Sequence, residues 1–134
     1  MYAIVKDGGR QYKCEVGRKM FLELREVEAG ATLELDQVLL ISREVETKDE
    51  DGKTKTEQVV TVGQPTIEGA KVVCEVMTRE VEVKDENGKT KKVETTEFKG
   101  PKVVIRWFRR RKNSRKKNGH RQTYIQVEVK EIVG

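Results

Sequence analysis

Short runs in which apolar and polar residues alternate recur along most of this chain of 134 residues. Alternation with a period of two predicts strands that bury one face, and no segment has a convincing helical period. Residues 2–6 and 11–16 are expected to form two short strands around Asp7-Gly8-Gly9-Arg10, which has the composition of a hairpin turn. The pattern therefore predicts an all-β protein.

Later segments repeat the pattern. Met20, Leu22 and Leu24 alternate with Phe21, Glu23 and Arg25. Leu33 and Leu35 lead into the continuous apolar run 38–41, which is typical of a buried strand. Three further strands are predicted to bury one side-chain row each: Val72, Cys74 and Val76; Val103, Ile105 and Trp107; Ile125, Val127 and Val129. The last two of these strands are expected to be antiparallel neighbours that both pack on the core.

Charge is distributed very unevenly. Residues 98–127 contain no Asp or Glu, although an even distribution of the 23 acids would place about five there. The same window holds 11 of the 28 Lys and Arg residues, so the rest of the chain carries 17 bases against 23 acids. The protein is thus an acidic body with a strongly basic segment, and its expected partner is a polyanion.

The basic segment 106–124 reads RWFRRRKNSRKKNGHRQTY. Arginine predominates at its start, and the guanidinium fork suits phosphate contact and stacking on bases. Trp107, Phe108 and Tyr124 bracket the run and offer flat faces to unpaired bases. Because Asn113, Ser114, Asn118 and Gly119 favour turns, we expect a long extended loop that binds RNA.

An internal repeat marks two further segments. Residues 44–55 read EVETKDEDGKTK and residues 80–91 read EVEVKDENGKTK, and ten of the twelve positions are identical. Each copy centres on Asp-Gly or Asn-Gly and predicts a hairpin with a three-residue loop and a left-handed Gly52 or Gly88. In the second copy, this register pairs Val81 with Val93, Glu82 with Lys92 and Asp85 with Lys89.

The two repeated hairpins, near residues 44–58 and 78–97, are too polar to belong to the core. Residues 44–58 carry six acids and three bases, and residues 78–97 carry six acids and five bases. We therefore expect both hairpins to project from a face that is turned away from the nucleic acid.

Composition argues against other classes of protein. No apolar run approaches the length of a membrane span, and the strand-like start predicts no signal or transit segment. Cys14 and Cys74 are predicted to be buried free thiols, because each lies in an alternating apolar run. With a single His in the chain, no metal site and no cofactor are expected.

Three segments together resemble the large-subunit ribosomal protein L-twenty-one family of bacteria and organelles. They are MYAIVKDGGRQYKCEVG at the start, VGQPTIEGAKVVCEV from residue 62 to 76, and residues 102–132 with Gly119-His120-Arg121-Gln122. These segments cover about half of the chain in the family's order. The repeated hairpins look longer than the corresponding loops of the family. Asp7 stands where the family usually has a small hydroxyl residue, and Thr123 stands where the family often has a proline or an aromatic residue.

The resemblance implies one all-β domain over residues 1–134, a small barrel or two-sheet sandwich of about six antiparallel core strands. It implies a structural constituent of the large ribosomal subunit that binds large-subunit rRNA, supports subunit assembly and lies beside the ribosomal protein L-twenty. Bacterial-type, cytoplasmic ribosomes are the expected location. No membrane, no small-molecule substrate and no obligate homo-oligomer are expected.

The candidate RNA-binding residues belong to the basic arm, with one residue of the first hairpin turn. They are Arg106, Trp107, Phe108, Arg109, Arg110, Arg111, Lys112, Asn113, Arg115, Lys116, Lys117, Asn118, Gly119, His120, Arg121, Gln122, Tyr124 and Arg10.

Two alternatives remain at this point. A nuclease would need a carboxylate cluster or a His pair beside the arm, and the acid-free window argues against one. His120 is therefore expected to make a backbone or phosphate hydrogen bond and not to act as a general base. A generic single-stranded nucleic-acid-binding barrel of the OB type would share the strands and the charge.

Overall fold

A computed structural model describes residues 1–48, 54–84 and 89–134, which form eleven strands and confirm the all-β prediction. The strands are β1 (Tyr2–Asp7), β2 (Arg10–Cys14), β3 (Lys19–Glu23), β4 (Thr32–Leu35), β5 (Val38–Lys48), β6 (Thr54–Val62), β7 (Lys71–Val76), β8 (Arg79–Lys84), β9 (Thr90–Thr95), β10 (Glu97–Arg109) and β11 (Ser114–Val133). Within these ranges, the structure contains no helix that is long and apolar enough to cross a membrane.

Two sheets enclose the core. One sheet has the strand order β2-β1-β5-β6, and the other has the order β10-β11-β7-β4 with β3 paired to β11. Seven strands contribute buried apolar residues, close to the six core strands that the resemblance implied. The largest fully buried side chains come from both sheets: Leu22, Ile41, Ile125, Val5, Val38, Val72, Val127 and Val129. The predicted rows on β7 and β11 are therefore confirmed.

The N-terminal hairpin forms as predicted. Asp7 pairs with Arg10, so Gly8 and Gly9 make a two-residue turn with φ of 54° and 77°. A turn with two left-handed residues matches the twist of the flanking strands, and glycine adopts that conformation without a steric penalty.

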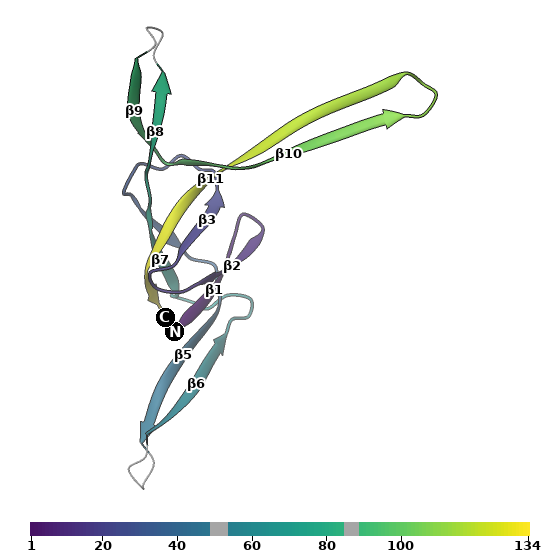
Figure 1. Ribbon diagram of the computed structural model, residues 1–134. Helices are drawn as coiled ribbons and strands as arrows, with labels where there is room; N and C mark the ends of the chain where they lie inside the picture. The colour runs from purple at the N-terminus through teal and green to yellow at the C-terminus, as the bar shows by residue number, and fades with distance from the viewer. Residues whose placement is uncertain (49–53, 85–88) are drawn as a thin grey trace.

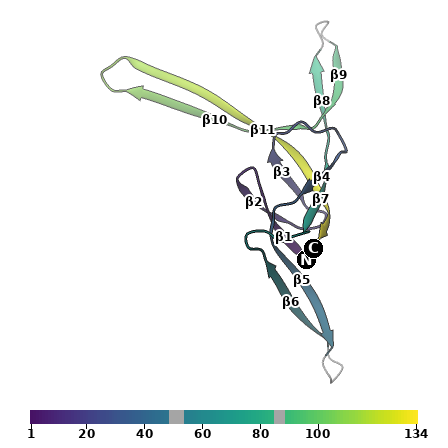
Figure 2. The same cartoon turned by 180° about the vertical axis from the view of Figure 1, so that it is seen from behind.

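The two repeated hairpins also form, at opposite ends of the molecule (Figures 1 and 2). In β8 and β9, Val81 pairs with Val93 and Glu82 with Lys92, which confirms the predicted register. In β5 and β6, Lys48 pairs with Thr54. The predicted Asp85–Lys89 pair and the left-handed glycines Gly52 and Gly88 involve residues outside the described ranges.

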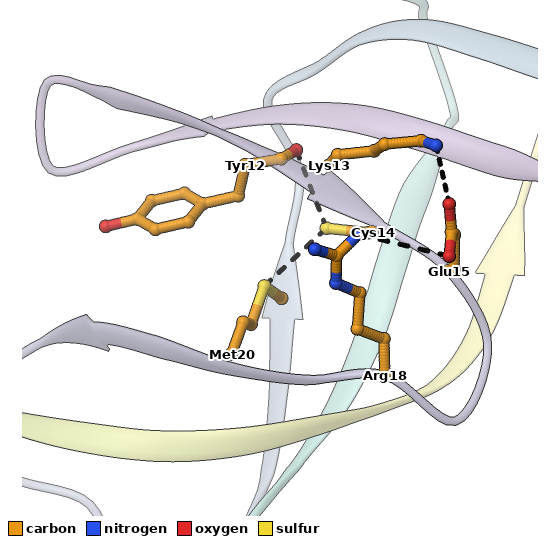
Figure 3. Close-up of polar contacts among 6 residues, drawn as sticks. All are labelled: Tyr12, Lys13, Cys14, Glu15, Arg18 and Met20. Carbon is orange, nitrogen blue, oxygen red and sulfur yellow. Dashed lines mark hydrogen bonds and ion pairs between the residues drawn. The ribbon is translucent and has the colours of Figure 1, made fainter.

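Both cysteines are buried free thiols, as predicted. Cys14 Sγ donates to the carbonyl oxygen of Tyr12 and lies 3.8 Å from Met20 Sδ (Figure 3). Near it, ion pairs join Lys13 and Arg18 to Glu15 (Figure 3). Burial raises the pKa of Cys14 to about 11 and that of Cys74 to about 12. Both thiols therefore remain protonated and pack as small apolar groups.

One predicted strand does not pack on the core. Val103, Ile105 and Trp107 are 53%, 58% and 47% exposed, because β10 leaves the body after Lys99. The register with β11 shifts between Lys99 and Lys102, so β10 contains one extra residue there. An extra residue sends every later side chain of the strand to the opposite face of the sheet.

Candidate nucleic-acid interface

The basic segment forms a two-stranded antiparallel ribbon that extends far from the body (Figures 1 and 2). Its pairing runs from Lys102 and Arg121 to Arg109 and Ser114, and we name residues 102–121 the ribbon. The expectation of a long loop was therefore wrong. Val103, Val104, Ile105, Trp107 and Phe108 favour extended backbone, and this preference outweighs the turn formers in the opposite strand.

The tip of the ribbon is a short turn at residues 110–113. Arg111 has φ of 57° and Asn113 has φ of 50°, so both adopt left-handed backbone. Asn113 thus acts as the predicted turn residue. Asn118 and Gly119 instead lie within β11, and Gly119 is not left-handed. A Cβ at Gly119 would lie 2.9 Å from Lys102 Cε, the flexible end of a side chain.

Every ribbon residue except Ser114 is exposed, and cross-strand partners share a face. One face, which we name the charged face, carries five bases together with two apolar side chains and a glycine. Its cross-strand pairs are Lys102 with Arg121, Val104 with Gly119, Arg106 with Lys117 and Phe108 with Arg115. This face holds no acid, so it offers a continuous positive surface to phosphate.

The opposite face, which we name the stacking face, is less charged and more apolar. Its cross-strand pairs are Val103 with His120, Ile105 with Asn118, Trp107 with Lys116 and Arg109 with Ser114. The guanidinium of Arg109 lies 5.0 Å from the centre of the Trp107 ring. An exposed indole beside a cation is a suitable surface for an unpaired base.

Open cavities follow the outer half of the ribbon. One of about 540 Å³ is lined by Arg106, Trp107, Phe108, Arg115, Lys116 and Lys117. A second, of about 500 Å³, is lined at the tip by Phe108, Arg109, Arg110, Arg111, Asn113, Ser114 and Arg115. No acidic side chain lines either cavity.

At the base of the ribbon, a chain of polar contacts joins β11 to the body. His120 Nε2 lies 2.9 Å from Gln122 Oε1, and Gln122 Nε2 donates to Glu23 Oε2 at 3.2 Å. Glu23 also pairs with Arg10 at 3.3 Å. A hydrogen bond with Tyr124 and the charge of Glu23 raise the pKa of Arg10. His120 thus contacts a side-chain amide, whereas the sequence predicted a backbone or phosphate contact.

An aromatic cluster lies next to these contacts. The ring of Phe21 is 5.9 Å from that of Phe98 and 6.4 Å from that of Tyr124. The cavity beside them has a volume of about 520 Å³, and Arg10, Arg79 and Lys99 also line it. Of the sequence-predicted residues, Arg10 and Tyr124 therefore meet at the base of the ribbon, whereas Arg110–Asn113 form the turn at its tip.

Sequence reasoning missed several residues of this surface. Phe98, Lys99 and Lys102 lie inside the acid-free window, which was the available signal. Phe21 occupies an outward position of an alternating strand and is 48% exposed, so it could have been recognised as an aromatic residue without a core role. Arg79 carried no signal in the sequence, because its place depends on the path of β8.

The two repeated hairpins, which were both expected to face away from the nucleic acid, lie differently relative to the basic segment (Figure 1). The β5–β6 hairpin lies at the far end of the body (Figure 1). The β8–β9 hairpin instead rises beside the base of the ribbon, and Val81, Val83 and Val93 line a cavity of about 510 Å³ together with Lys99 and Arg121.

Among the described residues, no group of three or more His, Cys, Asp or Glu side chains could hold a metal ion. The ribbon and its base therefore offer charge, flat rings and amides as their chemistry.

Comparison with known proteins gives a family for nearly the whole chain. Residues 1–132 match the family described as ribosomal prokaryotic L21 protein. The chain belongs to this family. Relatives named large ribosomal subunit protein bL21 include those of Porphyromonas gingivalis, 42% identical, and Parabacteroides distasonis, 40% identical, each over 99% of both chains. The protein of Dictyoglomus thermophilum is 36% identical over 99% of this chain and 97% of its own.

Members of the L21 family are structural proteins of the ribosome and not enzymes, so membership decides against a nuclease. It also favours the ribosomal interpretation over a generic OB-type module, because the match extends through both repeated hairpins and the ribbon.

Proposed function

We propose that this protein is a structural constituent of the large ribosomal subunit and that its ribbon binds large-subunit rRNA. The observation that carries the proposal is a long ribbon that contains no acidic residue. No second layer covers it, so both of its faces are exposed. An isolated two-stranded ribbon is marginally stable in water, and exposed apolar side chains such as Ile105 and Phe108 imply a partner.

The two faces suit different parts of an RNA. The five bases of the charged face suit contact with a phosphate backbone, and the release of counterions condensed on the RNA would drive their binding. Trp107 on the stacking face, and the Phe21–Phe98–Tyr124 cluster at the base, match unpaired bases. The proposed contact residues are those predicted from the sequence, which are residues 106–122 other than Ser114, together with Tyr124 and Arg10. Lys99 and Lys102 are added to them.

The rest of the chain is proposed to be one domain over residues 1–134 that holds the ribbon in place. Its proposed neighbour is the ribosomal protein L-twenty, and the support for this is the family resemblance alone. A location in cytoplasmic ribosomes is supported by the bacterial relatives.

The test replaces residues 102–121 by Asn-Gly and follows the chain in a sucrose gradient of cell extract. The parent is expected to sediment with large subunits, and the variant is expected to remain at the top of the gradient. Cooperative thermal unfolding of the purified variant is the control, because the ribbon contributes no core residue. A folded variant that sediments with the large subunit at the parent level would refute the proposal.

A further inference from the structure

The β8–β9 hairpin has two chemically different faces. The side chains of Glu80, Glu82 and Glu94 lie on the outer face, where Lys92 pairs with Glu80 at 3.4 Å. The inner face carries Arg79, Val81, Val83, Lys91, Val93 and Thr95, and none of the described inner-face residues of β8 and β9 is acidic. A hairpin that was only solvated would not need to place its acids on one side.

The inner face borders the base of the ribbon. Arg79, Val81, Val83, Val93, Thr95, Glu97, Lys99 and Arg121 line one cavity of about 510 Å³. Three bases and one acid give this cavity a positive wall, and its other wall is apolar. Arg79 and Lys99 also line the neighbouring aromatic cavity, so these two bases lie between the two cavities.

The same cavity lies on the side of the charged face. Arg121 belongs to that face by its pairing with Lys102, and Lys99 pairs with Thr123, two residues further along the same side of β11. The positive surface of the ribbon therefore extends through Arg121 and Lys99 to Arg79 of the separate β8–β9 sheet, which lines the same cavity.

The first hairpin offers an internal comparison. At equivalent positions of the repeat, Val81 opposite Val93 becomes Val45 opposite Glu57, and Val83 becomes Thr47. The equivalent of Arg79 is Arg43, which donates to the carbonyl oxygen of Gly134 at 2.7 Å. The first copy thus lacks both the three-valine row and an open basic residue beside it.

We propose that the inner face of the β8–β9 hairpin is a second RNA-binding surface, continuous with the charged face of the ribbon. This inference rests on the proposed function of the ribbon. Arg79, Lys99 and Arg121 contact phosphates, and the valine row packs against sugars and base edges of the same strand. RNA is favoured over a protein partner because the positive wall continues that of the ribbon and carries only Glu97 as an acid.

The first test locates the partner in intact large subunits. A benzophenone amino acid is placed at Val93 on the inner face or at Lys92 on the outer face, and the purified subunits are irradiated. Position 93 is expected to give rRNA adducts at least fivefold more often than position 92. Adducts of position 93 with a ribosomal protein would overturn the proposal in favour of a protein partner, and equal or absent adducts would overturn it altogether.

The second test measures affinity for purified large-subunit rRNA with two substitutions that each add one negative charge. Val93→Glu introduces on the inner face the acid that the first copy carries at Glu57, and Thr90→Glu places it on the outer face. Val93→Glu is expected to weaken binding by roughly fivefold or more, and Thr90→Glu by less than about twofold. Equal effects would contradict the proposal.

A ribbon variant separates this inference from the proposed function. If Arg106→Ala with Lys117→Ala weakens rRNA binding while Val93→Glu does not, the ribbon binds RNA and the hairpin face does not. If neither substitution changes rRNA affinity, the proposed function itself fails. Val93 is 47% exposed, so its replacement is expected to leave thermal unfolding unchanged, and the melting curve checks this.

Discussion

The two faces of the ribbon predict that equal losses of charge have unequal effects. Arg106 and Lys117 form a cross-strand pair on the charged face, while Arg109 and Lys116 lie on the stacking face. Replacing either pair by Ala removes two positive charges from the ribbon. We expect the first pair to contact phosphate, and the second pair to flank Trp107.

The size of the effect follows from counterion release. Each lost phosphate contact flattens the plot of log affinity against log salt by roughly 0.7–0.9, so Arg106→Ala with Lys117→Ala is expected to flatten it by roughly 1.4–1.8. The ratio of the parent's affinity to the variant's affinity is therefore expected to be roughly 25- to 60-fold larger at 0.1 M salt than at 1 M salt. The pair Arg109 and Lys116 is expected to change the slope by less than about 0.7.

Binding of purified large-subunit rRNA at five salt concentrations measures both slopes. Trp107→Ala serves as the uncharged comparison and is expected to weaken binding by about 1–3 kcal/mol, the value of one stacked base, without a change of slope. If the two double variants had the same slope, the ribbon would act as an undirected electrostatic tether and the assignment of two faces would be wrong.

Three further predictions concern stability. Replacing residues 102–121 by Asn-Gly should leave cooperative unfolding with a melting temperature within about 5 °C of the parent, since no core residue is removed; a molten product would contradict this. Gly63→Ala should lower the free energy of unfolding by roughly 1–3 kcal/mol in chemical denaturation, because the new Cβ would clash with the backbone of Thr66 and Ile67. Burial raises the pKa of Cys14 to about 11 and that of Cys74 to about 12. The contribution of the two buried thiols to stability is therefore full below the pKa of the unfolded thiol, about 8.5, and should decline as the pH rises toward 11. Chemical denaturation at pH 8 and 10.5 measures this decline, with a Cys-free variant as the control.

Most of the body could be predicted from the sequence, because strand alternation and turn composition are local signals. The turn at Gly8 and Gly9, the buried rows of β7 and β11, and the register of Val81 with Val93 were all accessible in this way. The location of the basic segment was equally accessible, because charge along the chain is visible without any fold.

The sequence could not show which strands cover one another and which residues far apart in the chain lie side by side. Val103, Ile105 and Trp107 have the alternation of a core strand, yet their burial depends on whether a second layer covers β10, and none does. The position of Arg79 at the cavities beside the base of the ribbon likewise depends on the direction in which β8 leaves the body. Glu23 contacts both Gln122, which is 99 residues away in the sequence, and Arg10, which is 13 residues away. No local pattern reveals these contacts.

The bulge at Gly100 and Pro101 explains why an alternating strand became an exposed ribbon. Proline has no amide hydrogen to donate to a ladder, so pairing breaks there. Before the bulge, Lys99 lies on the side of β11 that carries Ile125. After the bulge, that side is occupied by Lys102, Val104 and Arg106 instead of Val103 and Ile105. One extra residue therefore determines which row of β10 joins the bases of β11.

Deleting Pro101 should remove the bulge without exchanging the two faces. Gly100 would then pair with Gln122, and Lys102 would keep its pairing with Arg121, so the charges of the ribbon and their arrangement on two faces stay as they are. What changes is the bend that a bulge adds to its strand, and with it the direction of the ribbon. Subunit incorporation is therefore expected to fall at least tenfold, while the melting curve of the body stays unchanged because residues 102–121 contribute nothing to the core. Pro101→Ala is the matched control: it keeps the residue count and the register, and should incorporate like the parent. Normal incorporation of the deletion variant would show that the bend at the bulge is not needed to direct the ribbon.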